Sequence, residues 1–206
     1  MLKVWGRANS INVQKVLWCC AELDLPFERT DAGGPYGNTQ EPHYLAMNPN
    51  GLVPTIRDGS LVLWESNVIV RYLCAEYGDE KLCPREPSAR ANVERWMDWQ
   101  LGTLWAAMRP AYVGLVRAAE QDRDETAIQH SLDRTAEAWM VIEKQLADTE
   151  FSAGTRFTMA DIPLGTTAYR WMSMDIRRPP TPNIEAWYER LQERPAFREN
   201  VMLPLS

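Results

Sequence analysis

Histidine and cysteine are scarce in this chain of 206 residues. The two histidines, His43 and His130, lie far apart, and none of the four cysteines belongs to a Cys-x-x-Cys pair. Structural metal sites and disulfide frameworks use such residues at short, regular spacings. We therefore expect no metal ion in this protein. The cysteines are expected to be free, buried thiols: Cys19, Cys20, Cys74 and Cys83.

Long apolar runs and clusters of basic residues are also absent from the sequence. No stretch approaches the roughly 20 apolar residues that span a bilayer, and no long apolar segment follows the charges of residues 1–7. Lys and Arg total 22 against 28 Asp and Glu, which gives a net charge of -6. Nucleic acids and anionic membranes bind basic surfaces. The sequence therefore predicts neither as a partner, and it predicts a cytoplasmic protein.

The first half of the chain predicts a small mixed sheet covered by helices. Runs typical of strands occur at residues 2–5, 27–31, 53–57 and 61–64, and helical patterns at residues 11–24, 42–47 and 65–77. The Asp58-Gly59 pair between two such runs predicts an antiparallel hairpin. A right-handed connection between the first two strands makes them parallel. Residues 1–80 are thus expected to form an α/β domain.

The second half of the chain predicts an all-α domain. Residues 79–87, with two prolines and mixed charges, are typical of a linker, and the later apolar patterns have helical spacing. Long helices are expected at residues 93–108 and 128–146, and shorter ones from about residue 161 and from about residue 183 to 193. Pro110 lacks the N–H group that a helix interior needs, so we expect it to kink the first long helix. The helical domain spans residues 88–206.

Ser10 stands between the first strand and the first helix, where a hydroxyl and free N–H groups stabilise an anion such as a thiolate. Lowering a thiol pKa of about 8.5 by about two units takes about 2.7 kcal/mol. A charge-assisted hydrogen bond contributes roughly 1.5–3 kcal/mol and a helix end roughly 0.3–1 kcal/mol. Ser10 and the helix end therefore suffice for such a site. The alternative is that Ser10 is only a helix N-cap.

Two later segments offer groups to an extended peptide. Pro54 stands at the start of a strand, where a cis bond turns the chain and leaves the backbone of Val53 to pair with a ligand. Glu65 and Ser66 open the next helix and offer a carboxylate to an ammonium and a hydroxyl to a carboxylate. Taken singly, these are also an ordinary strand-start proline and an ordinary helix cap.

In this order, four segments of the chain resemble the glutathione transferase family. They are Ser10-Ile11-Asn12-Val13-Gln14-Lys15-Val16, residues 48–54, residues 64–73 and Phe157-Thr158-Met159-Ala160-Asp161-Ile162. The resemblance covers the whole chain. It implies a thioredoxin-like α/β domain with cis-Pro54, an all-α second domain and a homodimer. It also implies an enzyme of detoxification that activates glutathione, its co-substrate, for attack on a small hydrophobic electrophile.

The resemblance also implies roles for individual residues. Ser10 would hydrogen-bond the glutathione sulfur, and Asn12 is a second candidate because Ser-x-Asn is similar to the Thr-x-Asn of a bacterial branch. Val53 would pair with the cysteinyl backbone, while Glu65 and Ser66 would hold the γ-glutamyl end. Leu52 stands where the family often has a basic residue, so the anchor of the glycyl carboxylate is open, with His43 and Arg7 as candidates.

A second-substrate pocket is expected on the helical domain. Trp105, Arg109 and Tyr112 recur at spacings of four and three residues, and Trp171 approaches from a later helix. Ordinary core packing is the alternative for the tryptophans, whereas Arg109 beside aromatic rings suggests contact with an anion. Two other functions stay open, namely a glutathione-dependent disulfide reductase and a non-catalytic glutathione-binding protein.

Overall fold

The computed structural model describes residues 1–80 and 82–206, so part of the expected linker, Lys81, lies outside the described residues. The N-terminal elements are β1 (Leu2–Trp5), α1 (Ile11–Glu22), β2 (Phe27–Thr30), η1 (Gly34–Tyr36), α2 (Pro42–Leu45), β3 (Thr55–Asp58), β4 (Leu61–Trp64) and α3 (Ser66–Tyr77). The four-stranded sheet has the order β2-β1-β3-β4, with β1 parallel to β2 and antiparallel to β3. The predicted mixed sheet and its closing hairpin are confirmed.

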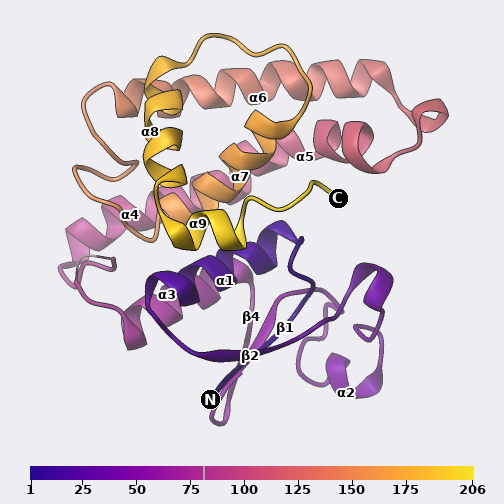
Figure 1. The fold of residues 1–206 in the computed structure, drawn as a ribbon, viewed down its shortest axis with the longest axis vertical. Helices are drawn as coiled ribbons and strands as arrows, with labels where there is room; N and C mark the ends of the chain where they lie inside the picture. Colours follow the sequence, from indigo (N-terminus) through magenta and orange to yellow (C-terminus); the bar gives the residue numbers. More distant parts are fainter. Residues whose placement is uncertain (81) are drawn as a thin grey trace.

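The helix α1 lies between the sheet and the helical domain, beside α3 (Figure 1). Its expected apolar positions, including Val13 and Val16, are fully buried. The polar residues Gln14 and Lys15 are buried as well: Gln14 donates to the carbonyl of Val201 after α9, and Lys15 bonds side chains of α3 and η2. Helix α1 is therefore covered on more than one side.

The C-terminal half is helical, as expected. Its elements are α4 (Pro87–Trp99), η2 (Gln100–Trp105), α5 (Ala106–Tyr112), η3 (Val113–Arg117), η4 (Glu120–Asp122), α6 (Glu125–Leu146), α7 (Asp161–Ser173), α8 (Pro182–Gln192) and α9 (Pro195–Asn200). Pro195 ends one helix and starts another, and this last short helix was not expected. Among the described residues, no helix has the length and apolar character needed to cross a membrane.

The first long helix is irregular around Pro110, although not in the way expected. Pro110 lies inside α5, and the turns on both sides, η2 and η3, are π-helical. A proline interrupts the regular hydrogen-bond ladder of a helix, and π-helical turns are another local irregularity of such ladders. The irregularity near Pro110 thus includes a π-helical segment on each side of α5.

Asp161 fastens the start of α7. Its carboxylate accepts hydrogen bonds from the backbone N–H groups of Thr158 and Ser152, each at 2.9 Å, and from Nε1 of Trp187 at 3.1 Å. The first of these bonds is the return bond of a capping box. Burial raises the pKa of Asp161, and the donors oppose that shift.

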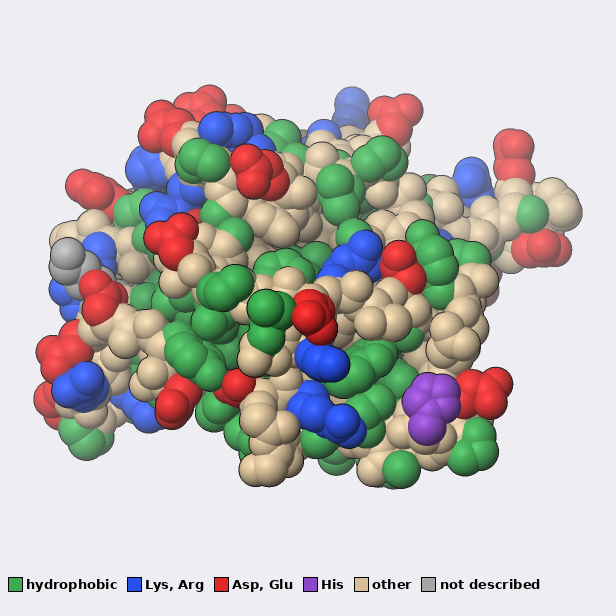
Figure 2. Space-filling model, turned by 60° about the horizontal axis from the view of Figure 1, so that its bottom comes forward, with side chains coloured by type: hydrophobic (Ala, Val, Ile, Leu, Met, Phe, Trp, Pro, Cys, Tyr) green, Lys and Arg blue, Asp and Glu red, His purple; other side chains and the backbone are tan. Residues whose placement is uncertain are grey.

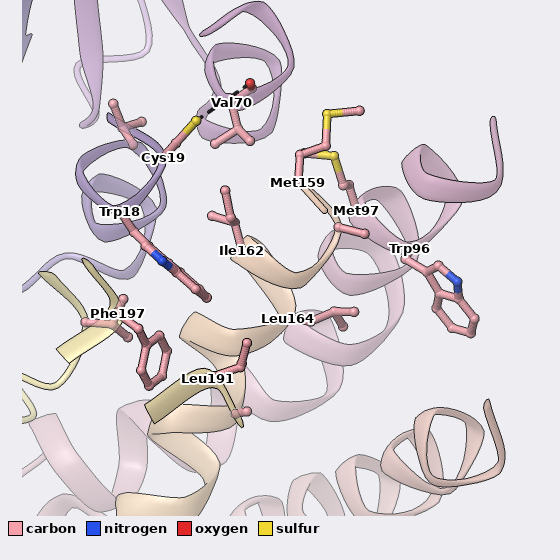
Figure 3. Packing of buried hydrophobic residues seen from close by; sticks show 14 of the residues in the cluster. Trp18, Cys19, Val70, Trp96, Met97, Met159, Ile162, Leu164, Leu191 and Phe197 are labelled. Atoms are coloured by element: carbon pink, nitrogen blue, oxygen red, sulfur yellow. Dashed lines mark hydrogen bonds between the residues drawn. The ribbon is translucent and has the colours of Figure 1, made fainter. Parts of the chain in front are cut away.

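One hydrophobic core joins the two halves of the molecule. Figure 3 shows Trp18 of α1 beside Phe197 of α9 and the side chain of Ile162 in α7. The ring centroids of Trp18 and Phe197 are 4.8 Å apart in an edge-to-face arrangement. The four cysteines are free and buried, as expected. The strand-helix half and the helical half thus hold each other in a fixed relation, with α1 as the shared element.

Candidate active site

Three segments converge on a hollow at the N-terminal end of α1. It is lined by Asn12, Asn48, Asn50, Leu52, Val53, Pro54, Trp64, Glu65 and Ser66. Asn12 belongs to α1, and the residues from Asn48 to Pro54 lie on the chain that leads into β3. Trp64, Glu65 and Ser66 lie at the junction of β4 and α3. The segments that sequence reasoning linked to glutathione therefore meet in space, although they lie up to 54 positions apart.

Ser10 is set back from this hollow and is only 7% exposed. It occupies the N-cap position of α1, with extended backbone angles, but its side chain makes no capping hydrogen bond. Its carbonyl accepts the N–H of Gln14 at 2.8 Å, which fixes the backbone of the first turn. The role of the Ser10 hydroxyl toward a ligand therefore stays a prediction, with the oxygen free of any capping bond to its own helix.

The peptide bond between Val53 and Pro54 is cis, as the resemblance implied. The segment before it is held by Tyr44 and Asn48, which donate hydrogen bonds to the carbonyl of Leu52 at 2.6 and 2.9 Å. Val53 itself precedes the sheet pairing, which begins at Thr55. Its backbone therefore stands at the edge of the hollow. Tyr44 was missed by sequence reasoning, because only the tertiary contact reveals its role.

Glu65 has a backbone conformation that is rare for a residue with a side chain. Its φ is +71°, in the left-handed region, directly before α3 begins. Such conformations cost of order 1–3 kcal/mol and persist where the surrounding structure enforces them, often at functional sites. Nothing in the sequence indicated this feature. It places an exposed carboxylate at the mouth of the hollow, next to the buried hydroxyl of Ser66.

Ser66 connects the hollow to the interior. Its hydroxyl donates to Oδ1 of Asn12 at 3.3 Å and accepts from Nζ of Lys15 at 3.5 Å. The ammonium of Lys15 also bonds the side-chain oxygens of Asn67 and Gln100. The pKa of Lys15 is lowered to about 7, mainly by burial and then by nearby Arg170, while Glu65 opposes the shift. Sequence reasoning included Lys15 in a motif but gave it no role.

Arg170 secures the loop before α1 from the side of the helical domain. Its Nη2 donates to the carbonyl of Asn9 at 3.2 Å, and its guanidinium lies 5.6 Å from the ring centroid of Tyr112. Burial lowers the pKa of Arg170 to about 10. This arginine was also missed, since its place on α7 gives no signal in the sequence.

Of the residues expected to wall a second-substrate pocket, Trp105 and Tyr112 contact each other, with ring centroids 5.8 Å apart. Tyr112 is fully buried and Trp171 is 2% exposed, whereas Trp105 is half-buried and Arg109 is exposed. Tyr112 ends the regular helix α5, and Trp171 lies on α7, which is covered on nearly every side. Both side chains are buried in this structure, and their contact with a second substrate stays a prediction.

The anchor for the glycyl carboxylate is still open. Leu52 is 66% exposed and forms part of the wall of the hollow. Arg7 is half-buried and close to Arg117, and His43 is exposed on α2. Neither Arg7 nor His43 is among the described residues that line the hollow.

A mixed sheet with a cis proline at the ligand-facing edge, followed by a helical domain, defines a thioredoxin-like binding protein of the two-domain type. Two family models match the chain: glutathione S-transferase, N-terminal domain, over residues 9–76, and glutathione S-transferase, C-terminal domain, over residues 103–195. The chain belongs to the glutathione S-transferase family.

Individual relatives agree with this assignment. Glutathione S-transferase GstB of Escherichia coli is 43% identical, with 100% of both chains covered. Glutathione S-transferase 3 of Zea mays is 32% identical over 97% of this chain and 93% of its own. The crystal structure of a theta class glutathione S-transferase from Xanthomonas axonopodis pv. citri, with glutathione bound, has a TM-score of 0.96 at 44% identity, covering 100% of this chain and 99% of that one. The predicted fold, family and transferase activity are thereby confirmed.

Proposed function

We propose that the protein activates the thiol of glutathione at the N-terminus of α1 for attack on an electrophilic carbon of a hydrophobic second substrate. The convergence of Asn12, the cis-proline segment and Ser66 on one hollow carries this proposal. The thiol loses its proton to solvent, the sulfur forms a bond to the carbon, and the leaving group departs with its electron pair. Binding both reactants in one orientation supplies much of the rate.

Two side chains are candidates for stabilising the thiolate. The hydroxyl of Ser10 does not cap its helix, and the N–H groups of the first turn add the positive end of the helix dipole. No acidic residue occupies that first turn to oppose it. The amide oxygen of Asn12 accepts from Ser66, which leaves its NH₂ group to donate to sulfur. Ser10 is the primary candidate and Asn12 the second.

The rest of the tripeptide has matching partners. The backbone of Val53 pairs with the cysteinyl residue as an added strand would. Glu65 offers its carboxylate to the α-ammonium of the γ-glutamyl end, and Ser66 with the first N–H groups of α3 offers donors to the adjacent carboxylate. Trp105, Arg109, Tyr112 and Trp171 are the candidates for contact with the second substrate, and Arg109 is the most exposed of them.

Substitution of Ser10 by Ala tests the proposal. We expect turnover with an aryl halide to fall at least about tenfold, because roughly 1.5–3 kcal/mol of thiolate stabilisation from the Ser10 hydrogen bond is lost, while glutathione binding changes little. Ultraviolet difference absorbance against pH measures the thiol pKa directly. An unchanged pKa and rate in the variant would remove Ser10 from the mechanism.

Assays of a small mixed disulfide in parallel separate transfer from reduction, and binding without any turnover would indicate a non-catalytic protein.

We also propose that two copies of the chain form a homodimer in the cytoplasm, where detoxification is the fitting role. Large apolar side chains are exposed on β4, α3 and η2, at Leu61, Trp64, Val68, Tyr77 and Leu101. Exposed apolar patches of this kind mark interaction surfaces.

On the face seen in Figure 2, acidic and basic side chains are interspersed. That pattern gives no support to a nucleic-acid partner.

A further inference from the structure

Lys15 is a charged side chain in the interior of the protein. It is 1% exposed, and its Nζ lies 3.5 Å from Oγ of Ser66, 3.3 Å from Oδ1 of Asn67 and 3.4 Å from Oε1 of Gln100. Ser66 and Asn67 belong to α3, and Gln100 begins η2 in the helical domain. The ammonium therefore holds together three elements from both halves of the molecule.

All three acceptors are neutral. Among the described residues, no ion pair within 4.0 Å involves Lys15. The charged groups that act on it are Arg170 from α7, which repels it, and Glu65 from the segment before α3, which attracts it. A buried ammonium without a bonded anion is costly. The environment of Lys15 is thus hydrogen-bonded but lacks a close negative charge.

Ser66 is the side chain through which the negative charge of a ligand in the hollow can act on Lys15. Ser66 contacts the ammonium on one side and lines the hollow on the other, where it also bonds Asn12. A ligand carboxylate that accepts the Ser66 proton in place of Asn12 would lie one hydroxyl group away from the ammonium. None of the other acceptors of Lys15 lines the hollow, so Ser66 is the connection between the buried charge and the ligand.

We propose that Lys15 is a positioning residue whose buried ammonium is the counter-charge for the γ-glutamyl carboxylate of glutathione, so that binding is accompanied by proton uptake at Lys15. This inference rests on the proposed placement of glutathione. Because the pKa of Lys15 is about 7, a large share of the free protein carries a neutral amine near neutral pH. An anion within reach raises the pKa of an amine, commonly by one unit or more. The carboxylate therefore favours the protonated form.

The sign of the pH dependence follows from this linkage. The protonated protein binds the carboxylate more tightly, so affinity falls as pH rises through the pKa of the free amine and levels off above the pKa of the bound one. A shift of about one unit corresponds to about a tenfold loss of affinity. The thiol of glutathione would contribute an opposite proton release, so the probe must lack it.

Isothermal titration with S-methylglutathione measures the proton count without thiol ionisation. Titrations at pH 7.5 in phosphate and in Tris, which differ in ionisation enthalpy, give the number of protons exchanged on binding. We expect the natural protein to take up about half a proton for each ligand bound, and Lys15→Met to take up none. The control Lys144→Met removes an exposed lysine on α6 and should match the natural protein. The affinity of the natural protein, divided by that of Lys15→Met at each pH so that ionisation of the ligand's own α-ammonium cancels, should fall about tenfold from pH 6 to pH 9.

The outcomes separate this inference from the function on which it rests. Binding of S-methylglutathione to the natural protein without proton uptake would overturn the role of Lys15 and leave the glutathione site intact. The same holds if uptake persists in Lys15→Met. Absence of any binding to the natural protein would overturn the proposed site itself. The proton count of the natural protein decides the matter even if Lys15→Met does not fold.

Discussion

At the scale of single residues, Leu52 shows what this site lacks. It is exposed on the wall of the hollow, where the resemblance led us to look for a basic residue. We predict that Leu52→Lys tightens glutathione binding about 1.4- to fivefold, because a solvent-exposed ion pair contributes roughly 0.2–1 kcal/mol. Calorimetric titration measures this change. The dipeptide γ-glutamylcysteine, which has no glycyl carboxylate, should show no gain, and an equal gain with both ligands would rule out this reason.

The buried charge of Lys15 also affects stability without any ligand. Its pKa is about 7 in the folded protein and about 10.5 in the unfolded chain, so between these values the unfolded state binds more protons. Stability contributed by this residue therefore rises with pH. We predict that the free energy of unfolding of the natural protein, relative to Lys15→Met, increases by about 2 kcal/mol from pH 7 to pH 9.

Guanidinium unfolding of both proteins at the two pH values measures this difference. Taking the difference between variants removes the contributions of the buried cysteines, whose raised pKa values affect both proteins alike. A difference that stays constant with pH would mean that the ammonium of Lys15 is solvated in solution.

At the scale of elements, the contact between α1 and α7 depends on a glycine. A Cβ atom placed on Gly165 would lie 2.8 Å from the ring of Trp18 and 2.8 Å from Leu191, so the two helices approach closely only because no side chain is present. We predict that Gly165→Ala lowers the free energy of unfolding by about 1–3 kcal/mol through overpacking. Gly102→Ala is the matched control, because no atom lies within 4 Å of its added Cβ. Equal melting temperatures for the two variants would contradict the close approach.

At the scale of the whole molecule, the exposed apolar surface on β4, α3 and η2 predicts the assembly state. We predict that Val68→Glu shifts the protein from dimer to monomer, because a buried carboxylate at an interface is costly. Sedimentation velocity measures the change. Met140→Glu is the control, since Met140 is as exposed as Val68, at 44%, but lies on α6 outside this surface. A natural protein that sediments as a monomer would overturn the proposed homodimer.

The sequence by itself determined the local elements and their order. Periodic apolar residues, the Asp58-Gly59 turn and the prolines specify helices, strands and breaks through interactions between near neighbours. Those same segments, taken in order, were enough to indicate the family and the positions of Ser10, Pro54 and Ser66. Such features depend on backbone chemistry within a few residues, which is why the sequence shows them.

Only the tertiary structure decided which side chains meet. The burial of Lys15 and Arg170, the left-handed backbone of Glu65 and the inward turn of Tyr112 all depend on contacts between segments far apart in the chain. A helical pattern identifies one apolar face, whereas α1 is covered on several sides once the second domain packs on it. Burial and electrostatic surroundings are properties of the assembled molecule, so the charges around the glutathione site follow from packing and not from local sequence.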